Sequence, residues 1–135
     1  MKILLGLLAT VTLTFVGCIT NTTGTNDPGN ETCVGGNNCV CPSNIGCDHT
    51  CSSGAAECHV QGGSAPVDVE CNNNLECHVE CAAATSCNVD CGGSAECHVT
   101  CPPSGCTVTD CVGSACVVSC GFGSATRSGS TATCP

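Results

Sequence analysis

The stretch CGGSAECHVTC, from Cys91 to Cys101, contains the pattern that determines the fold. Its second half alternates in the manner of a β-strand: Cys97, Val99 and Cys101 fall on one face, and polar residues fall on the other. Its first half is a tetrad of small residues, which is typical of a tight turn. The stretch therefore predicts a turn followed by a strand with one buried face.

Copies of this unit, each about ten residues long, recur from Cys33 to the C-terminus. Clear copies begin at Cys51, Cys71, Cys81 and Cys91. Short internal repeats indicate a stacked array in which each unit buries a face against its neighbours and the end copies deviate. The repeat region, residues 33–135, is therefore expected to form one cysteine-rich domain.

A second period lies over the first, because the motif ECHV returns only in alternate units, beginning at Glu57, Glu76 and Glu96. A coil of about twenty residues with two strands, one on each side, accounts for both periods. The sequence thus predicts an all-β protein, a narrow disulfide-stapled β-solenoid with valines such as Val79 and Val89 inside. The alternative is an antiparallel β-meander of disulfide-closed hairpins, which would leave the Val and Cys face uncovered.

One copy lacks two cysteines together: in QGGSAPVDVEC, Gln61 stands in the place of Cys91 and Val67 in the place of Cys97. Pairing across the tetrads loses one whole bridge here and strands no thiol. Pairing along a strand would join residues about 13 Å apart, beyond the reach of a disulfide. The predicted bridges are Cys33–Cys39, Cys41–Cys47, Cys51–Cys58, Cys71–Cys77, Cys81–Cys87, Cys91–Cys97, Cys101–Cys106, Cys111–Cys116 and Cys120–Cys134.

The N-terminus, MKILLGLLATVTLTFVGC, has one lysine and then an uncharged apolar run, which is typical of an export signal. Its end, Phe-Val-Gly-Cys18, is similar to the lipobox of bacterial lipoproteins. The resemblance implies that residues 1–17 are cleaved and that Cys18 receives a lipid, which anchors the protein to a membrane. Residues 18–32, rich in Thr, Asn and Gly, would then be a lipidated, flexible tether. The alternative is an ordinary cleaved signal.

The cysteine count agrees with this interpretation. Nineteen cysteines are present, and assigning Cys18 to lipid leaves an even number for disulfides. Because export places the chain in an oxidising compartment, these cysteines are expected to form a disulfide framework. We therefore expect a lipoprotein of the bacterial cell envelope, at the outer membrane or the cell surface.

Charge and composition limit the possible partners and indicate how the fold is stabilised. Beyond the predicted signal, Arg127 is the only strong base against eleven Asp and Glu residues, which makes nucleic acid an unsuitable partner. Two Phe, with no Trp or Tyr, provide little material for an apolar core, so disulfides must supply stability. The acidic surface favours cations or a protein of unidentified kind as partner.

The repeat region also resembles the beetle antifreeze proteins, which are thin β-solenoids with a disulfide bridging each coil. The resemblance implies the fold alone. Their ice-binding Thr-x-Thr ladder has no counterpart here, because the outward positions hold Glu, His, Asp, Asn and only occasional Thr. Ice binding is therefore not expected.

The ECHV units would stack Glu and His side chains in a ladder on one face of the solenoid. Imidazole and carboxylate groups are ligands for zinc and copper. The candidate metal ligands are Glu57, His59, Glu76, His78, Glu96 and His98. The simpler interpretation is a solvated strand face, since outward positions must be polar anyway. His49 stands at an inward Val position and is expected to pack rather than bind.

The sequence also bears on two other functional classes, thiolate-metal proteins and enzymes. Cysteine density favours a thiolate-metal cluster of the metallothionein kind, whereas export favours oxidised cysteines. Asp and His recur by repetition and not as one convergent set, so no enzyme and no resident cofactor are expected. The sequence predicts a lipid-anchored, non-enzymatic surface or structural protein that interacts with other molecules, with divalent zinc or copper binding as the alternative.

Overall fold

The computed structural model describes residues 30–33 and 38–135, with side chains from Asn38 onward. The predicted signal, most of the predicted tether and Cys18 lie outside the described residues, as does the side chain of Cys33. The elements are β1 (Asn30–Cys33), β2 (Asn38–Val40), β3 (Cys47–Cys51), β4 (Glu57–Gln61), β5 (Val67–Glu70), β6 (Glu76–Glu80), β7 (Cys87–Asp90), β8 (Glu96–Thr100), β9 (Cys106–Thr109), the short helix η1 (Gly113–Ala115), β10 (Cys116–Ser119), β11 (Thr126–Ser128) and β12 (Thr131–Cys134).

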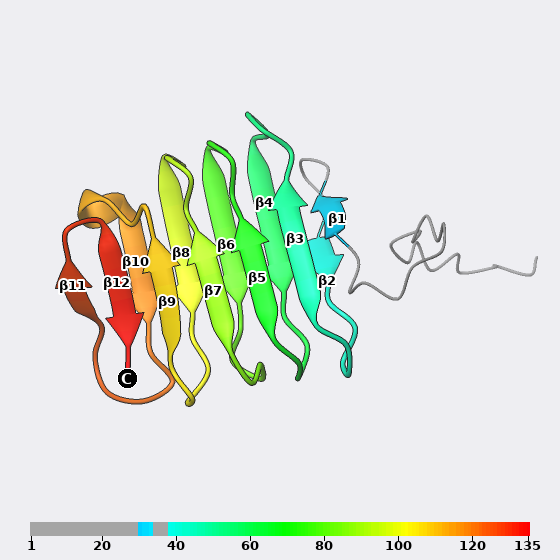
Figure 1. The fold of residues 1–135 in the computed structure, drawn as a ribbon. Coiled ribbons are helices and arrows are strands. Elements are labelled where there is room, and N and C mark those ends of the chain that lie inside the picture. Colours follow the sequence, from blue (N-terminus) through cyan, green and yellow to red (C-terminus); the bar gives the residue numbers. More distant parts are fainter. Residues whose placement is uncertain (1–29, 34–37) are drawn as a thin grey trace, which may run out of the picture.

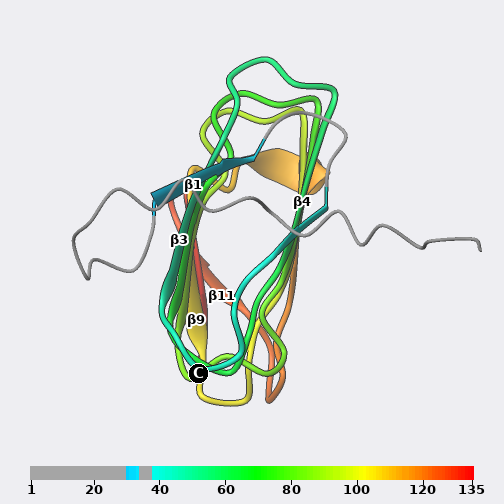
Figure 2. The same ribbon diagram turned by 90° about the vertical axis from the view of Figure 1, so that its right-hand side faces the viewer.

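The strands form two sheets that face each other (Figures 1 and 2). Odd-numbered strands lie in one sheet, in the order β1-β3-β5-β7-β9 followed by β12 and β11. Even-numbered strands form the other, in the order β10-β8-β6-β4-β2. Within both, each strand up to β10 pairs in parallel with the strand two places along the chain. The chain is therefore a β-solenoid of about four turns, as predicted, and the alternative antiparallel meander is wrong.

The interior is a thin layer of small side chains. Because strand residues alternate between faces, the valines of successive coils are buried one above another. In the even sheet these are Val60, Val79 and Val99, and in the odd sheet Val69, Val89 and Val108. His49 pairs in register with Val69 and is fully buried, so it takes a valine position as expected.

Disulfides line both edges where the chain turns between the two sheets. All seventeen cysteines whose side chains are described are disulfide-bonded, Cys39 among them. Eight bridges have both side chains described, with Cα atoms 5.2–6.2 Å apart, and all eight pairs are as predicted. Seven of them span one turn, whereas Cys120–Cys134 encloses β11. One edge holds Cys51–Cys58, Cys71–Cys77, Cys91–Cys97 and Cys111–Cys116, and the other holds Cys41–Cys47, Cys81–Cys87, Cys101–Cys106 and Cys120–Cys134.

The second edge lacks a disulfide at the turn between β4 and β5. The register of β4 there shows that the prediction for Gln61 is wrong. Gln61 does not replace a cysteine, because it ends β4 in register with Glu80. Gly62 takes the cysteine position instead. The backbone N–H groups that follow the even strands donate to the next coil in one series: Cys41 to Gln61, Gly62 to Glu80, Cys81 to Thr100 and Cys101 to Ser119.

The prediction that Val67 stands in the place of a cysteine is correct, since Val67 pairs in register with Cys47 on one side and Cys87 on the other. A Cβ atom on Gly62 would lie 3.1 Å from Cγ2 of Val67 and 2.9 Å from the Glu80 carbonyl oxygen. Val67 thus occupies the space of a disulfide, and Gly62 leaves room for it. A buried apolar side chain replaces the covalent bridge at this corner.

The corners themselves stack from coil to coil. Asn72 and Gly92 both have positive φ, 50° and 54°, at equivalent turns. The N–H of Asn73 donates to the carbonyl of Gly92, which joins the two turns. A side chain on Gly92 would place its Cβ 2.9 Å from the Asn72 backbone nitrogen, so this turn requires glycine.

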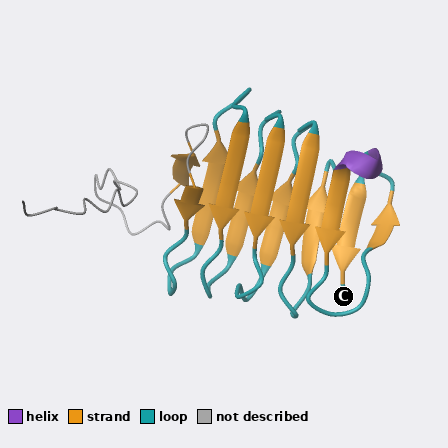
Figure 3. Ribbon diagram, turned by 180° about the vertical axis from the view of Figure 1, so that it is seen from behind, coloured by secondary structure: helices purple, strands orange, loops and turns teal. Residues whose placement is uncertain are grey.

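The C-terminus closes the stack differently from the coils. Strands β12 and β11 add to the odd sheet antiparallel, beyond β9 (Figure 3). The even sheet ends at β10, whose outer edge is open. Arg127 covers part of that edge, because its guanidinium donates to the carbonyls of Cys116 at 2.6 Å and Cys111 at 3.2 Å. The single strong base beyond the predicted signal thus satisfies the Cys116 carbonyl at the edge and the Cys111 carbonyl in the turn before β10.

A corner disulfide should be replaceable by a glycine and a valine, the two residues that occupy the corner without a bridge. The double substitution Cys81→Gly and Cys87→Val copies Gly62 and Val67 and leaves no thiol unpaired. We expect the variant to fold but to lose about 2 kcal/mol of unfolding free energy, the loop-closure contribution of so short a ring. Denaturant titration under non-reducing conditions measures this. Unchanged stability would show that the bridge contributes nothing.

The guanidinium fork of Arg127 should stabilise the C-terminal end. We expect Arg127→Ala to lower the unfolding free energy by about 2 kcal/mol, because two carbonyls lose a charged donor. Arg127→Lys keeps the charge but lacks the planar fork, so it should recover only part of the loss. Denaturant titration of both variants tests this. Wild-type stability of the lysine variant would show that charge alone is sufficient.

Candidate functional site

The outward face of the even sheet presents two unbroken columns of side chains. Strand register places Glu57 beside Glu76 and Glu76 beside Glu96, and it aligns the three histidines in the same way. Strands β4, β6 and β8, called the trio below, therefore each carry one Glu–His pair, two residues apart, on the solvent side. We call these pairs rungs, and the set the Glu/His ladder: Glu57 with His59, Glu76 with His78, and Glu96 with His98.

The imidazole rings of the ladder are stacked. The ring centroids of His59 and His78 are 4.6 Å apart with planes 6° from parallel, and those of His78 and His98 are 4.8 Å apart at 5°. Adjacent strands of a sheet lie about 4.8 Å apart, and the stacked rings keep this spacing. All three rings adopt the same orientation.

Within a rung, the imidazole faces its carboxylate. The Nε2···Oε2 distances are 3.6 Å for Glu57–His59, 3.6 Å for Glu76–His78 and 3.7 Å for Glu96–His98. Between 37% and 40% of each histidine side chain is exposed, so solvent and small ions reach all three. As simple ion pairs, such exposed contacts contribute little to stability. The structure therefore brings all six predicted ligands onto one accessible face.

The third outward column of this face is irregular. At that position the strands carry Gln61, Glu80 and Thr100, which are in register but chemically different. Strands β2 and β10, which border the trio, place Asn38 and Val117 beside the outer histidines. The ladder therefore consists of three rungs and ends at β4 on one side and at β8 on the other.

The opposite face of the solenoid is acidic, and the sequence reasoning did not single it out. Its side chains border a shallow hollow of about 320 Å³ on the odd sheet, with Asp68, Glu70 and Asp90 among them. Asn88 Nδ2 donates to Asp68 Oδ1 at 2.8 Å. The signal was present in the alternate units PVDV, SCNV and GCTV, but their outward residues change from coil to coil and form no repeated motif.

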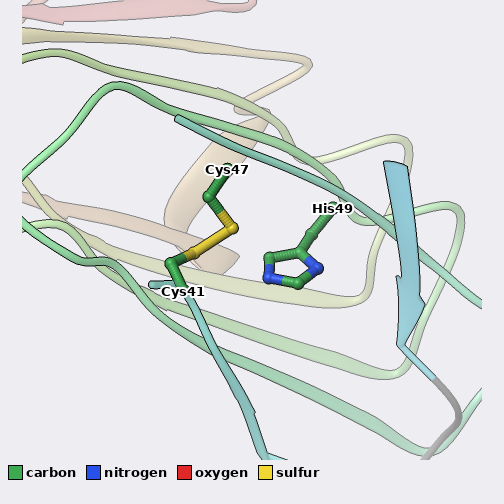
Figure 4. Close-up of side chains that lie close together, drawn as sticks. All are labelled: Cys41, Cys47 and His49. Carbon is green, nitrogen blue, oxygen red and sulfur yellow. A yellow bond between two sulfur atoms is a disulfide. The ribbon is translucent and has the colours of Figure 1, made fainter. Parts of the chain in front are cut away.

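The sulfur atoms offer a different kind of cluster. Among the described residues, the groups of three or more potential ligand atoms within 4.8 Å of one another consist of cysteines, in one case with His49. Figure 4 shows this case, in which the imidazole lies beside the Cys41–Cys47 disulfide. Sulfur in a disulfide is not a thiolate and does not ligate metal in that state. The described cysteines therefore do not form the thiolate cluster considered from the sequence.

Within the described part of the chain, none of the helices has the length and apolar character that membrane crossing requires.

Comparison of the chain with protein-family models, with curated proteins and with solved structures finds no match.

Proposed function

We propose that the protein is a lipid-anchored, non-enzymatic module of the bacterial cell envelope that presents the solenoid as a rigid interaction surface. The observation that carries this proposal is the double row of corner disulfides. Each described bridge limits the freedom of the unfolded chain and holds a corner. The outward side chains therefore keep fixed positions on a body with almost no apolar core.

Oxidised cysteines support an exported location. Seventeen disulfide-bonded cysteines agree with an extracellular or periplasmic compartment, where disulfides form and persist. The cytosol keeps thiols reduced. A framework of this density therefore belongs outside it.

The odd number of cysteines supports a lipid anchor on one of them. Nineteen cysteines leave one outside any complete set of intramolecular pairs. Cys18 stands at the end of the lipobox-like Phe-Val-Gly-Cys and is the residue that we assign to lipid. Its lipid would hold residues 18–32 at the membrane, and the acidic solenoid would be repelled from anionic headgroups and face away from them.

Substitution of Cys18 tests the anchor. We expect Cys18→Ser to abolish incorporation of labelled fatty acid and to move the protein out of the membrane fraction, because the sulfur that accepts the lipid is gone. Cys33→Ser is the matched control: it also removes one cysteine but leaves the lipid site. It should stay with the membrane and keep its label. Retention of the Cys18→Ser protein in membranes at its correct mature mass contradicts the proposal.

A further inference from the structure

The Glu/His ladder is the surface feature that the chain repeats without change. The turns before the three rungs, SSGAA, NNNL and GGSA, vary in sequence and length, and the adjacent outward column changes at every coil. Glutamate and histidine nevertheless return at the same two positions in all three strands. A requirement for polarity alone would be met by any hydrophilic residue, as it is in the neighbouring column.

The glutamate column also has an electrostatic cost. Register places the three carboxylates directly beside one another on adjacent strands, and like charges in that arrangement destabilise a sheet. No lysine or arginine lies within the trio to offset them. The column therefore favours a positively charged partner from solution.

Each rung has the separation expected of two ligands on one metal ion. Zinc holds imidazole nitrogen and carboxylate oxygen at about 2.0–2.2 Å, which places two tetrahedral ligand atoms about 3.4 Å apart. The Nε2···Oε2 distances of 3.6–3.7 Å are close to this value. They are longer than a hydrogen bond, so the two atoms face each other without being joined.

We propose that the central rung binds one divalent transition ion of the zinc or copper class, with His78 Nε2 and Glu76 Oε2 as its two direct protein ligands. Carboxylates of Glu57 and Glu96, on the flanking strands, offset the charge of the ion. Water fills the remaining coordination positions. This site goes beyond the proposed surface role and does not depend on the lipid anchor.

Ring geometry favours one rung over a bridge between rungs. A metal lies in the plane of the imidazole that binds it, along the nitrogen lone pair. Because the rings of His59, His78 and His98 are parallel within 6°, their lone pairs point in the same direction and do not converge. The ring geometry therefore favours coordination within one rung over an ion shared by neighbouring imidazoles.

The central position follows from the neighbours. His78 is the only described ladder histidine with a Glu–His rung on both sides, since Asn38 and Val117 border the outer ones. An ion at the centre thus experiences three ladder carboxylates, with Glu80 of the same strand two residues beyond His78, whereas an ion at either end experiences two ladder carboxylates. Ions on adjacent rungs would lie about 4.8 Å apart and repel each other strongly. One ion per chain is the expected stoichiometry.

Calorimetric titration of the oxidised full chain with zinc chloride tests the site, after a thiol assay has shown that no free cysteine is present. We expect saturable binding of one ion per chain, and tighter binding of copper(II) in a parallel titration. His78→Gln and Glu76→Gln should each weaken zinc binding at least tenfold. Glu70→Gln is the matched control, because it removes the same charge from the opposite face, and it should leave the affinity within about twofold.

Two outcomes overturn the proposal. The first is a weak signal that salt abolishes equally in the wild type and in His78→Gln, since it shows only screening of an acidic surface. The second is saturable binding that survives His78→Gln but is lost in His59→Gln or His98→Gln, since it places the ion elsewhere on the ladder. Circular dichroism of each variant confirms that the solenoid is intact, so that a loss of binding reports the site itself.

Discussion

The corner disulfide is the interaction on which the rest of this molecule depends. A coil of two short strands encloses little more than one pair of valines, and that layer is too thin to hold two sheets together against chain entropy. The cross-link acts on the unfolded chain, whose freedom it limits, and in the folded chain it fixes the distance between the sheets at both edges. Where one bridge is absent, Val67 fills the same volume beside Gly62 and the register continues without a shift.

Fixed corners give the outer faces their regularity. Because each coil repeats the last with parallel strand register, any residue kept at one outward position becomes a column with the spacing of β-strands. Glu and His are kept at two such positions through three coils, whereas the odd sheet changes its outward residues from Asp48 to Asn88 and Thr107. The same scaffold therefore carries an ordered ladder on one side and a variable acidic surface on the other. The proposed ion site is a consequence of that order.

Much of this architecture could be predicted from spacing alone. Alternation of Cys, Val and Cys specifies the buried face, the joint loss of two cysteines indicates which partners pair, and the return of ECHV in alternate units gives the coil length. The position of the missing cysteine could not be assigned correctly from the sequence. The turn from Gly62 to Val67 is one residue shorter than its counterpart from Cys81 to Cys87, and Gln61 is the last residue of β4, so in the aligned repeats Gln61 looks like a substituted cysteine. Arg127 gave no local signal either, since its two acceptors, one in β10 and one in the turn before it, come near the guanidinium only in the folded stack. The rung distances depend on side-chain rotamers, which a sequence pattern does not specify.

A disulfide map of the oxidised protein tests the central claim, that bridges across the turns define the coils, most directly. Non-reducing digestion followed by mass spectrometry should recover peptides that link Cys71 to Cys77, Cys81 to Cys87 and Cys91 to Cys97. A peptide that links Cys58 to Cys71 would contradict the account, because Cys58 is bonded to Cys51 and Cys71 to Cys77, each across its own turn.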